Sequence, residues 1–199
     1  MASAVLHRLG RGREIATRFN TEPAAWRMAE LLAAGTRCPP TTSLGRWFDA
    51  AAGLLGVCLR MGYEGEAAMR LETLAARSGA CLPMHGGWRI DSEGTLDLLP
   101  LLARLADERD VARGAALFHA TLAAALEAWV LRAVDHSGIR AVVLSGGCFL
   151  NRQLSRDLAR RLAARGLDVL EARQVPPNDG SLALGQAHVA RHILSEGGC

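Results

Sequence analysis

Apolar residues recur every three to four positions over most of the chain, and this period predicts a helix-rich fold. Between residues 79 and 98, glycines and alternating apolar positions such as Trp88 and Ile90 predict a short β-hairpin. The first 20 residues show no clear period, so we expect residues 1–20 to be a loose or truncated segment ahead of a domain over 21–199. The expected helices of the first two thirds cover residues 24–34, 44–59, 65–76, 100–106 and 112–136.

The pattern changes after residue 138. An apolar run over 139–144 predicts a buried strand, and residues 150–165 then follow a helical period. A second strand is expected over 167–171 and a closing helix over 181–194. Strand, helix, strand and helix at this spacing predict a parallel βαβ unit near the C-terminus.

Ser145-Gly146-Gly147 follows the first of these strands directly, and Asn151 comes before the next helix. Glycine lets the backbone approach a bulky anion, because no Cβ intervenes. A helix that starts near Phe149 would point its N–H groups and its positive dipole end at the same place. The pattern favours a phosphate or adenylate site, although a glycine pair is also ordinary in a simple turn.

Asp179 lies in a second turn, Pro176-Pro177-Asn178-Asp179-Gly180, directly before the closing helix. Its carboxylate could cap that helix by accepting backbone N–H bonds. Alternatively, it could project beside the Gly146-Gly147 loop and hold a metal or a phosphate-bound water. The sequence leaves both interpretations open.

Composition narrows the function classes. All 23 basic residues are arginine, which excludes a mechanism based on a phosphate-binding lysine, and the net charge is only +3. Aromatic residues are scarce and are not interleaved with the arginines, so we expect no nucleic-acid surface. The chain lacks an uninterrupted apolar stretch of about 18 residues and a signal peptide, so we expect no membrane association and a cytoplasmic location.

Cysteine and histidine spacing does not indicate a zinc cluster or a disulfide framework, since the five cysteines are far apart. Cys148, inside the glycine loop, is expected to pack rather than react. His188 and His192 form the single H-x-x-x-H pair, for which an exposed helix face is favoured over a metal site. His119 is interpreted as a packing residue. The cysteines are Cys38, Cys58, Cys81, Cys148 and Cys199.

Three groups of segments resemble the C-terminal part of the HypF-type carbamoyltransferases, which mature NiFe-hydrogenases. Their order and spacing match over nearly the whole chain. The first joins residues 42–50, Thr42-Ser43-Leu44-Gly45-Arg46-Trp47-Phe48-Asp49-Ala50, with Tyr63-Glu64-Gly65-Glu66-Ala67-Ala68. The second is Phe118-His119-Ala120-Thr121-Leu122-Ala123, and the third joins residues 145–152 with residues 178–186.

This resemblance implies an α/β fold, namely a lobe of an actin-like ATPase (ASKHA) domain. It also implies the chemistry: a YrdC-like domain makes carbamoyl-adenylate from carbamoyl phosphate and ATP, and the actin-like domain passes the carbamoyl group to the C-terminal cysteine of HypE. The partner's thiolate is the nucleophile, so no catalytic pair is expected within this chain. The implied residues are Ser145, Gly146, Gly147 and Asn151 at the adenylate, Asp49 with Glu64 or Glu66 near the ribose or carbamoyl end, and Asp179 as a ligand of a divalent zinc or iron.

The chain also departs from the family. It lacks the YrdC-like domain, the other N-terminal modules and the first half of the actin-like domain, whose paired histidines complete the metal site. We therefore expect a fragment that needs its missing N-terminal half. One alternative is a non-catalytic interaction module or degenerate remnant. A second is a tRNA threonylcarbamoyladenosine-type lobe, disfavoured because Glu64-Gly65-Glu66-Ala67-Ala68 replaces the Pro-Gly-Gly-Pro of that branch.

Overall fold

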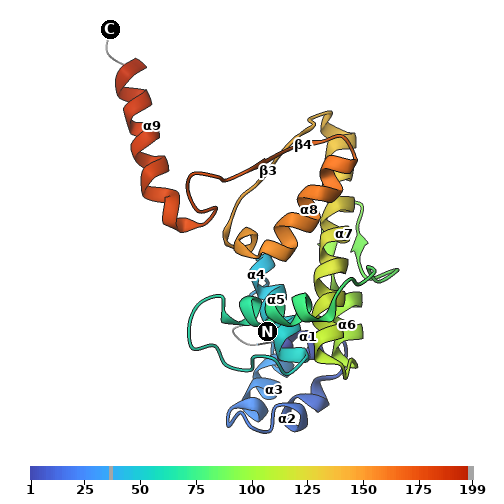
Figure 1. The fold of residues 1–199 in the computed structure, drawn as a ribbon. Helices are drawn as coiled ribbons and strands as arrows, with labels where there is room; N and C mark the ends of the chain where they lie inside the picture. Colours follow the sequence, from blue (N-terminus) through green and yellow to red (C-terminus); the bar gives the residue numbers. More distant parts are fainter. Residues whose placement is uncertain (36–37, 197–199) are drawn as a thin grey trace. The chain divides into compact units, whose positions relative to one another are not determined.

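The structure is a computed structural model that describes residues 1–35 and 38–196. The chain divides into two compact units, Met1–Gly138 and Ile139–Cys199 (Figure 1). The division falls at Gly138, which ends a long helix with a positive φ of 72°. Cys199, the last of the five cysteines, lies outside the described residues.

The first 20 residues are helical, which differs from the loose segment expected from the sequence. They form α1 (Ala2–Arg8), the 3-10 helix η1 (Gly12–Glu14) and α2 (Ile15–Arg18). Leu6 and Ile15 are fully buried, so the segment belongs to the core of the first unit. Because each of these helices spans seven residues or fewer, none is long enough to show a clear period in the sequence.

Four of the expected helices of the first unit are present near their predicted bounds. They are α3 (Ala25–Ala33), α4 (Leu44–Leu54), α5 (Glu66–Ser78) and α6 (Leu99–Ala106). The α4 helix ends earlier than expected, because the chain turns at Gly56 with a positive φ of 70°. Antiparallel β1 (Arg89–Ile90) and β2 (Leu96–Asp97) confirm the predicted hairpin.

The long α7 helix (Val111–Ser137) forms the centre of the first unit. The Asp110 side chain caps it by accepting a hydrogen bond from the Arg113 N–H. Phe118 is fully buried and meets the Phe48 ring edge-on, with 5.0 Å between centroids. By length and composition alone α7 is apolar enough to cross a membrane, but 67% of its apolar window is buried within the protein, as in a core helix.

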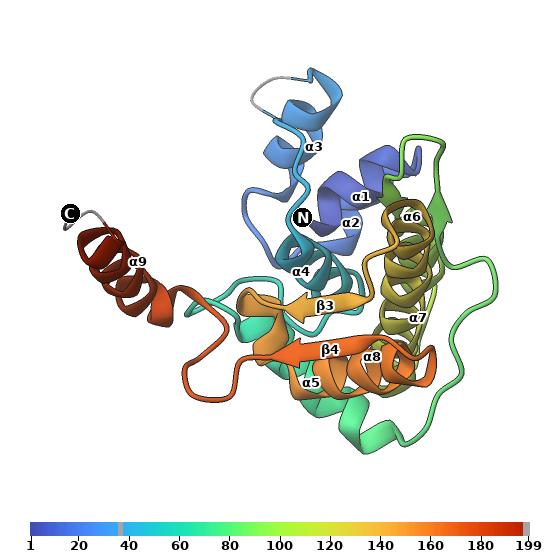
Figure 2. The same cartoon turned by 90° about the horizontal axis from the view of Figure 1, so that it is seen from above.

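The second unit contains the predicted βαβ arrangement, which is confirmed. Strands β3 (Ala141–Leu144) and β4 (Asp168–Glu171) pair in parallel, with Val143 opposite Leu170 (Figure 2). Helix α8 (Arg152–Ala164) connects them and buries Leu154, Leu158 and Leu162. The remaining elements are the 3-10 helices η2 (Gly147–Leu150) and η3 (Asp179–Ser181) and the closing helix α9 (Leu182–Glu196).

Candidate functional site

The loops that follow the two parallel strands of the second unit are tied together by a backbone hydrogen bond. The Gly146 N–H donates to the Pro177 carbonyl oxygen at 2.7 Å. Gly146 has φ 106° and ψ 161°, a conformation that is essentially restricted to glycine. Both loops lie at the carboxyl ends of their strands, where open α/β sheets bind ligands.

Gly147 is the second residue at which the two loops come close to each other. A Cβ built on Gly147 would lie 4.0 Å from the Asn178 Cβ, with no nearer atom, so the first loop here faces open space beside the second. Ser145, Gly146 and Gly147 are all exposed. The structure therefore presents a short exposed stretch of backbone and one hydroxyl next to the turn that carries Asp179.

The helix expected to start near Phe149 starts later. Residues 147–150 form η2, and α8 begins at Arg152. Asn151 is its N-cap: the Asn151 Oδ1 accepts a hydrogen bond from the Leu154 N–H at 2.9 Å, and Asn151 is only 5% exposed. Asn151 thus has a structural role in starting α8 that was not predicted from the sequence.

Asp179 is exposed and is the first residue of η3. The neighbouring Asn178 caps this turn, since its Oδ1 accepts the Gly180 N–H at 3.2 Å. The side chain that caps η3 is therefore that of Asn178. Among residues 1–35 and 38–196, no group of three or more His, Cys, Asp or Glu side chains could hold a metal ion. The described residues alone do not fit a zinc or iron site.

Four other residues singled out in the sequence have ordinary surroundings. His188 and His192 are exposed on α9, as expected. His119 is 1% exposed, with its Nδ1 2.9 Å from the Ala115 carbonyl oxygen and its ring 5.6 Å from that of Phe118, which confirms its packing role. Burial lowers the pKa of His119. Cys148 is partly buried.

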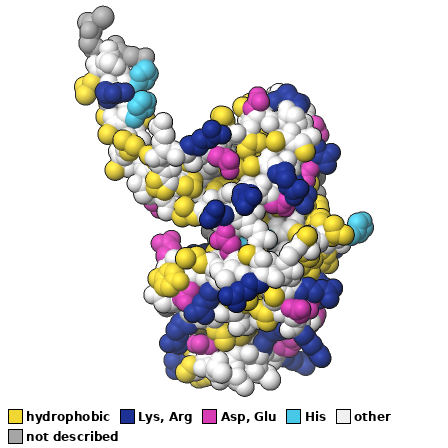
Figure 3. All heavy atoms as spheres, in the orientation of Figure 1, with side chains coloured by type: hydrophobic (Ala, Val, Ile, Leu, Met, Phe, Trp, Pro, Cys, Tyr) yellow, Lys and Arg dark blue, Asp and Glu magenta, His cyan; other side chains and the backbone are white. Residues whose placement is uncertain are grey.

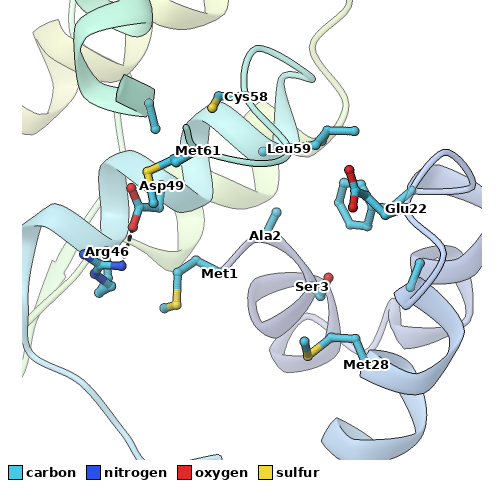
Figure 4. Close-up of a pocket in the computed structure, with 14 residues that line it drawn as sticks. Met1, Ala2, Ser3, Glu22, Met28, Arg46, Asp49, Cys58, Leu59 and Met61 are labelled. Atoms are coloured by element: carbon cyan, nitrogen blue, oxygen red, sulfur yellow. Dashed lines mark ion pairs between the residues drawn. The ribbon is translucent and has the colours of Figure 1, made fainter. Parts of the chain in front are cut away.

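Asp49 lines a cavity of about 420 Å³ in the first unit (Figure 4). Most of the residues that line this cavity are apolar, and they include Met28 and Met61 with their thioethers. The Arg46 Nη1 lies 2.8 Å from the Asp49 Oδ2 as an ion pair, without the alignment of a hydrogen bond. This buried carboxylate oxygen consequently accepts no hydrogen bond from the described residues and could accept one from a ligand hydroxyl.

Neither glutamate suggested by the sequence lines this cavity. Glu64 is exposed, whereas Glu66 is 6% exposed at the start of α5. The Glu66 carboxylate accepts the Gly62 N–H at 2.6 Å and pairs with Arg70 at 2.6 Å. Glu66 thus fixes the turn before α5. Met28, Met61 and Cys58 were not predicted as lining residues, because they come from a helix and a loop that share no motif.

Residues 1–186 match the family described as "Carbamoyltransferase, Kae1-like Domain, second subdomain". The chain is 53% identical to carbamoyltransferase HypF2 of Cupriavidus necator, over 96% of this chain and 27% of that protein. It is 46% identical to a carbamoyltransferase HypF homolog of the same organism, over 96% of this chain and 51% of that protein. Carbamoyltransferase HypF of Rhizobium leguminosarum is 42% identical, over 91% of this chain and 24% of that protein.

Solved structures agree with this match. A full-length HypF in a phosphate- and nucleotide-bound form superposes with a TM-score of 0.77 at 26% identity, over 97% of this chain and 26% of that chain. HypF of T. kodakarensis gives a TM-score of 0.67 at 27% identity, over 85% of this chain and 22% of that chain. This chain thus spans 27% of HypF2, and the expected α/β fold of an actin-like lobe is confirmed. It belongs to the HypF-type carbamoyltransferase family and corresponds to the second subdomain of the Kae1-like domain.

Proposed function

We propose that this chain holds the nucleotide end of carbamoyl-adenylate and, together with the part of the transferase that it does not span, passes the carbamoyl group to the C-terminal cysteine of a HypE-like protein. In NiFe-hydrogenase maturation this group becomes the cyanide ligand. The observation that carries the proposal is the Gly146–Pro177 hydrogen bond, which joins the two loops at the carboxyl ends of β3 and β4. A related HypF was solved in a nucleotide-bound form, which supports this assignment.

The loop chemistry suits a phosphate. Gly147 leaves space for an anion, and the exposed Ser145 hydroxyl can donate a hydrogen bond to a phosphate oxygen. In the transfer step the partner's thiolate attacks the carbamoyl carbon, a C–S bond forms, and the C–O bond to phosphate breaks with release of AMP. Because the acyl-phosphate bond is already activated, the protein mainly has to position the reactants and stabilise the developing oxyanion.

Asp49 is the residue of the first unit that we assign to the nucleoside. A ribose hydroxyl could donate to its Oδ2, which accepts no hydrogen bond from the described residues. Glu66 is a poorer candidate, since its carboxylate already holds the turn before α5. The exposed Glu64 remains the alternative for the ribose or carbamoyl end.

A metal enters this proposal only through Asp179, as one ligand of a zinc or iron site completed outside this chain. No step is assigned to it, because the described residues do not form a metal site. The further partners that we propose are the N-terminal part of the relatives, which this chain does not span, and a YrdC-like domain; we propose no nucleic-acid or membrane partner. A free thiolate and an ATP-derived substrate fit the cytoplasm.

Reconstitution of transfer tests the proposal. The chain matches 51% of the HypF homolog of C. necator, and the rest of that homolog would be made as a separate polypeptide. The 199-residue chain would be mixed with this polypeptide, a YrdC-like domain, carbamoyl phosphate, ATP and a HypE-like protein. We expect mass spectrometry to show one added carbamoyl group on the C-terminal cysteine. Binding of the acceptor without transfer, while the intact HypF homolog is active, would instead indicate a non-catalytic module. Modification of tRNA would indicate the threonylcarbamoyl branch.

A further inference from the structure

Ser155 interrupts the leucine face of α8. The buried side chains of this helix are those of Leu154, Ser155, Leu158 and Leu162, and Ser155 is 9% exposed. The other face carries arginines such as Arg156, and Figure 3 shows basic side chains exposed over this helix. Serine is a weak helix former, and a buried hydroxyl without a partner costs free energy. The serine at this position therefore needs an explanation other than packing.

The hydroxyl of Ser155 reaches back to the loop that follows β3. Its Oγ donates a hydrogen bond to the Phe149 carbonyl oxygen at 2.7 Å. Phe149 is the third residue of η2, the turn over residues 147–150 that begins with Gly147. The bond thus ties the far end of this turn to a side chain of α8 that lies six residues further along the chain.

Two backbone hydrogen bonds close the turn itself. The Phe149 N–H donates to the Gly146 carbonyl oxygen at 3.0 Å, and the Asn151 N–H donates to the Cys148 carbonyl oxygen at 3.2 Å. Both bonds are local, so they shape the turn but do not hold it against the helix. The Ser155 contact does this, because it connects the turn to the first turn of α8, beside the Asn151 cap.

We propose that Ser155 is a positioning residue of this carbamoyltransferase, which holds η2 so that Gly147 faces the phosphate of the nucleotide. The Ser155 hydroxyl is engaged with Phe149, so it acts through the turn and not on the ligand. A loop that is already ordered binds a ligand more tightly than one that must be ordered during binding. This inference rests on the proposed function, because it takes Gly147 as the residue beside the phosphate.

Calorimetry with ATP tests this role. Ser155→Ala removes one oxygen and retains a good helix former. We expect it to bind ATP about three- to tenfold more weakly than the wild-type chain, because the turn loses one hydrogen bond and must be ordered during binding. Ser155→Thr keeps the hydroxyl and should bind ATP within about twofold of the wild-type chain.

Leu162→Ile, at the other end of α8, is the matched control for a general loss of helix stability. This swap conserves side-chain volume and destabilises a packed core slightly, but it leaves the Ser155–Phe149 contact in place. We expect it to lower the unfolding midpoint and to change the ATP affinity by less than about twofold. Unchanged ATP affinity in Ser155→Ala, or an equal loss in Leu162→Ile, would overturn the positioning role.

Hydrogen exchange separates this inference from the proposed function. In the chain without ligand, Ser155→Ala should speed exchange of the Phe149 and Asn151 amides about threefold or more, whereas Leu162→Ile should not. Unchanged exchange of these amides in Ser155→Ala, with ATP still bound by the wild-type chain, would contradict the positioning role alone. A wild-type chain that binds no ATP, with amide exchange that depends on Ser155, would contradict the proposed nucleotide site alone.

Discussion

The Gly146 N–H donates a 2.7 Å hydrogen bond to the Pro177 carbonyl oxygen, and this contact joins residues 31 positions apart at the ends of two parallel strands. It also changes the role expected for Gly146. Its N–H holds the second loop in place, so the open backbone beside it belongs to Gly147. Gly146 is consequently a positioning residue, and Gly147 is the residue that we expect to face the phosphate.

Gly146→Ala should destabilise the second unit by about 1–3 kcal/mol, because the native φ of 106° is strained for any residue with a Cβ. Urea denaturation would measure the loss. Gly185→Ala is the control, since this helical glycine has open space around it and alanine favours the helix. Equal stability of Gly146→Ala and wild type would mean that the loop tolerates another conformation.

Asn151→Ala should cost about 1 kcal/mol through loss of the α8 cap. Asn151→Asp keeps an oxygen that can accept the Leu154 N–H and should retain most of this stability. If Asn151 also contacts the adenylate, Asn151→Asp should weaken nucleotide binding at nearly unchanged stability, because it places a negative charge near phosphate. Calorimetry that shows wild-type affinity for Asn151→Asp would restrict Asn151 to its capping role.

Much of the fold was predictable because several helices are long and rich in apolar residues. Helices α5 and α7 lie within a few residues of their predicted bounds, and the βαβ order is confirmed. The segment over residues 1–20 was not predictable, because η1 and α2 are too short for a period, although Leu6 and Ile15 are fully buried. The N-terminal bound of α8 was misplaced because η2 interrupts the chain between Gly147 and Asn151.

The site was predictable only where a local motif marks it. One of the two interpretations of the Asp179 turn placed it beside the Gly146-Gly147 loop, and the structure brings Gly146 and Pro177 of these two loops together. The cavity around Asp49 was not predictable from spacing, because its wall combines α3, α4 and the loop around Met61. The turn-fixing contact between Glu66 and the Gly62 N–H also depends on tertiary geometry.

The stability of the first unit should fall as the pH drops below about 6.5, the ordinary pKa of histidine. Burial lowers the pKa of His119 in the folded state, so the unfolded chain takes up the proton first and is favoured. His119→Gln should flatten the pH dependence of the unfolding free energy between about pH 7 and pH 5. His136→Gln is the comparison variant, because it replaces an exposed histidine of α7 in place of the buried one.

A different group of residues governs stability at lower pH. Hydrogen bonds from Arg11 lower the pKa of Asp107 and of Glu14. Their contribution is present above their unfolded pKa values and is lost as the pH falls below about 4. If His119→Gln changed the slope only in this lower range, the assignment of the effect near neutral pH to His119 would be wrong.

The 199-residue chain alone should retain less than about 0.1 equivalent of zinc or iron after dialysis, because a transition-metal site takes about four ligands and Asp179 supplies one. Elemental analysis by mass spectrometry would measure the retained metal. Retention of one equivalent that Asp179→Ala alone releases would contradict a site completed outside this chain. Retention that depends on His188 and His192 would instead place a site on α9.

Calorimetry with ATP, comparing the wild-type chain with Gly147→Val, tests the nucleotide site most directly. A Cβ at Gly147 meets no atom nearer than 4.0 Å, so the substitution should leave the fold largely intact while its methyl groups occupy the phosphate position. We predict that wild type binds ATP and that Gly147→Val shows no measurable binding at an unchanged unfolding midpoint. Unchanged affinity in Gly147→Val would contradict the assignment of this loop to the nucleotide.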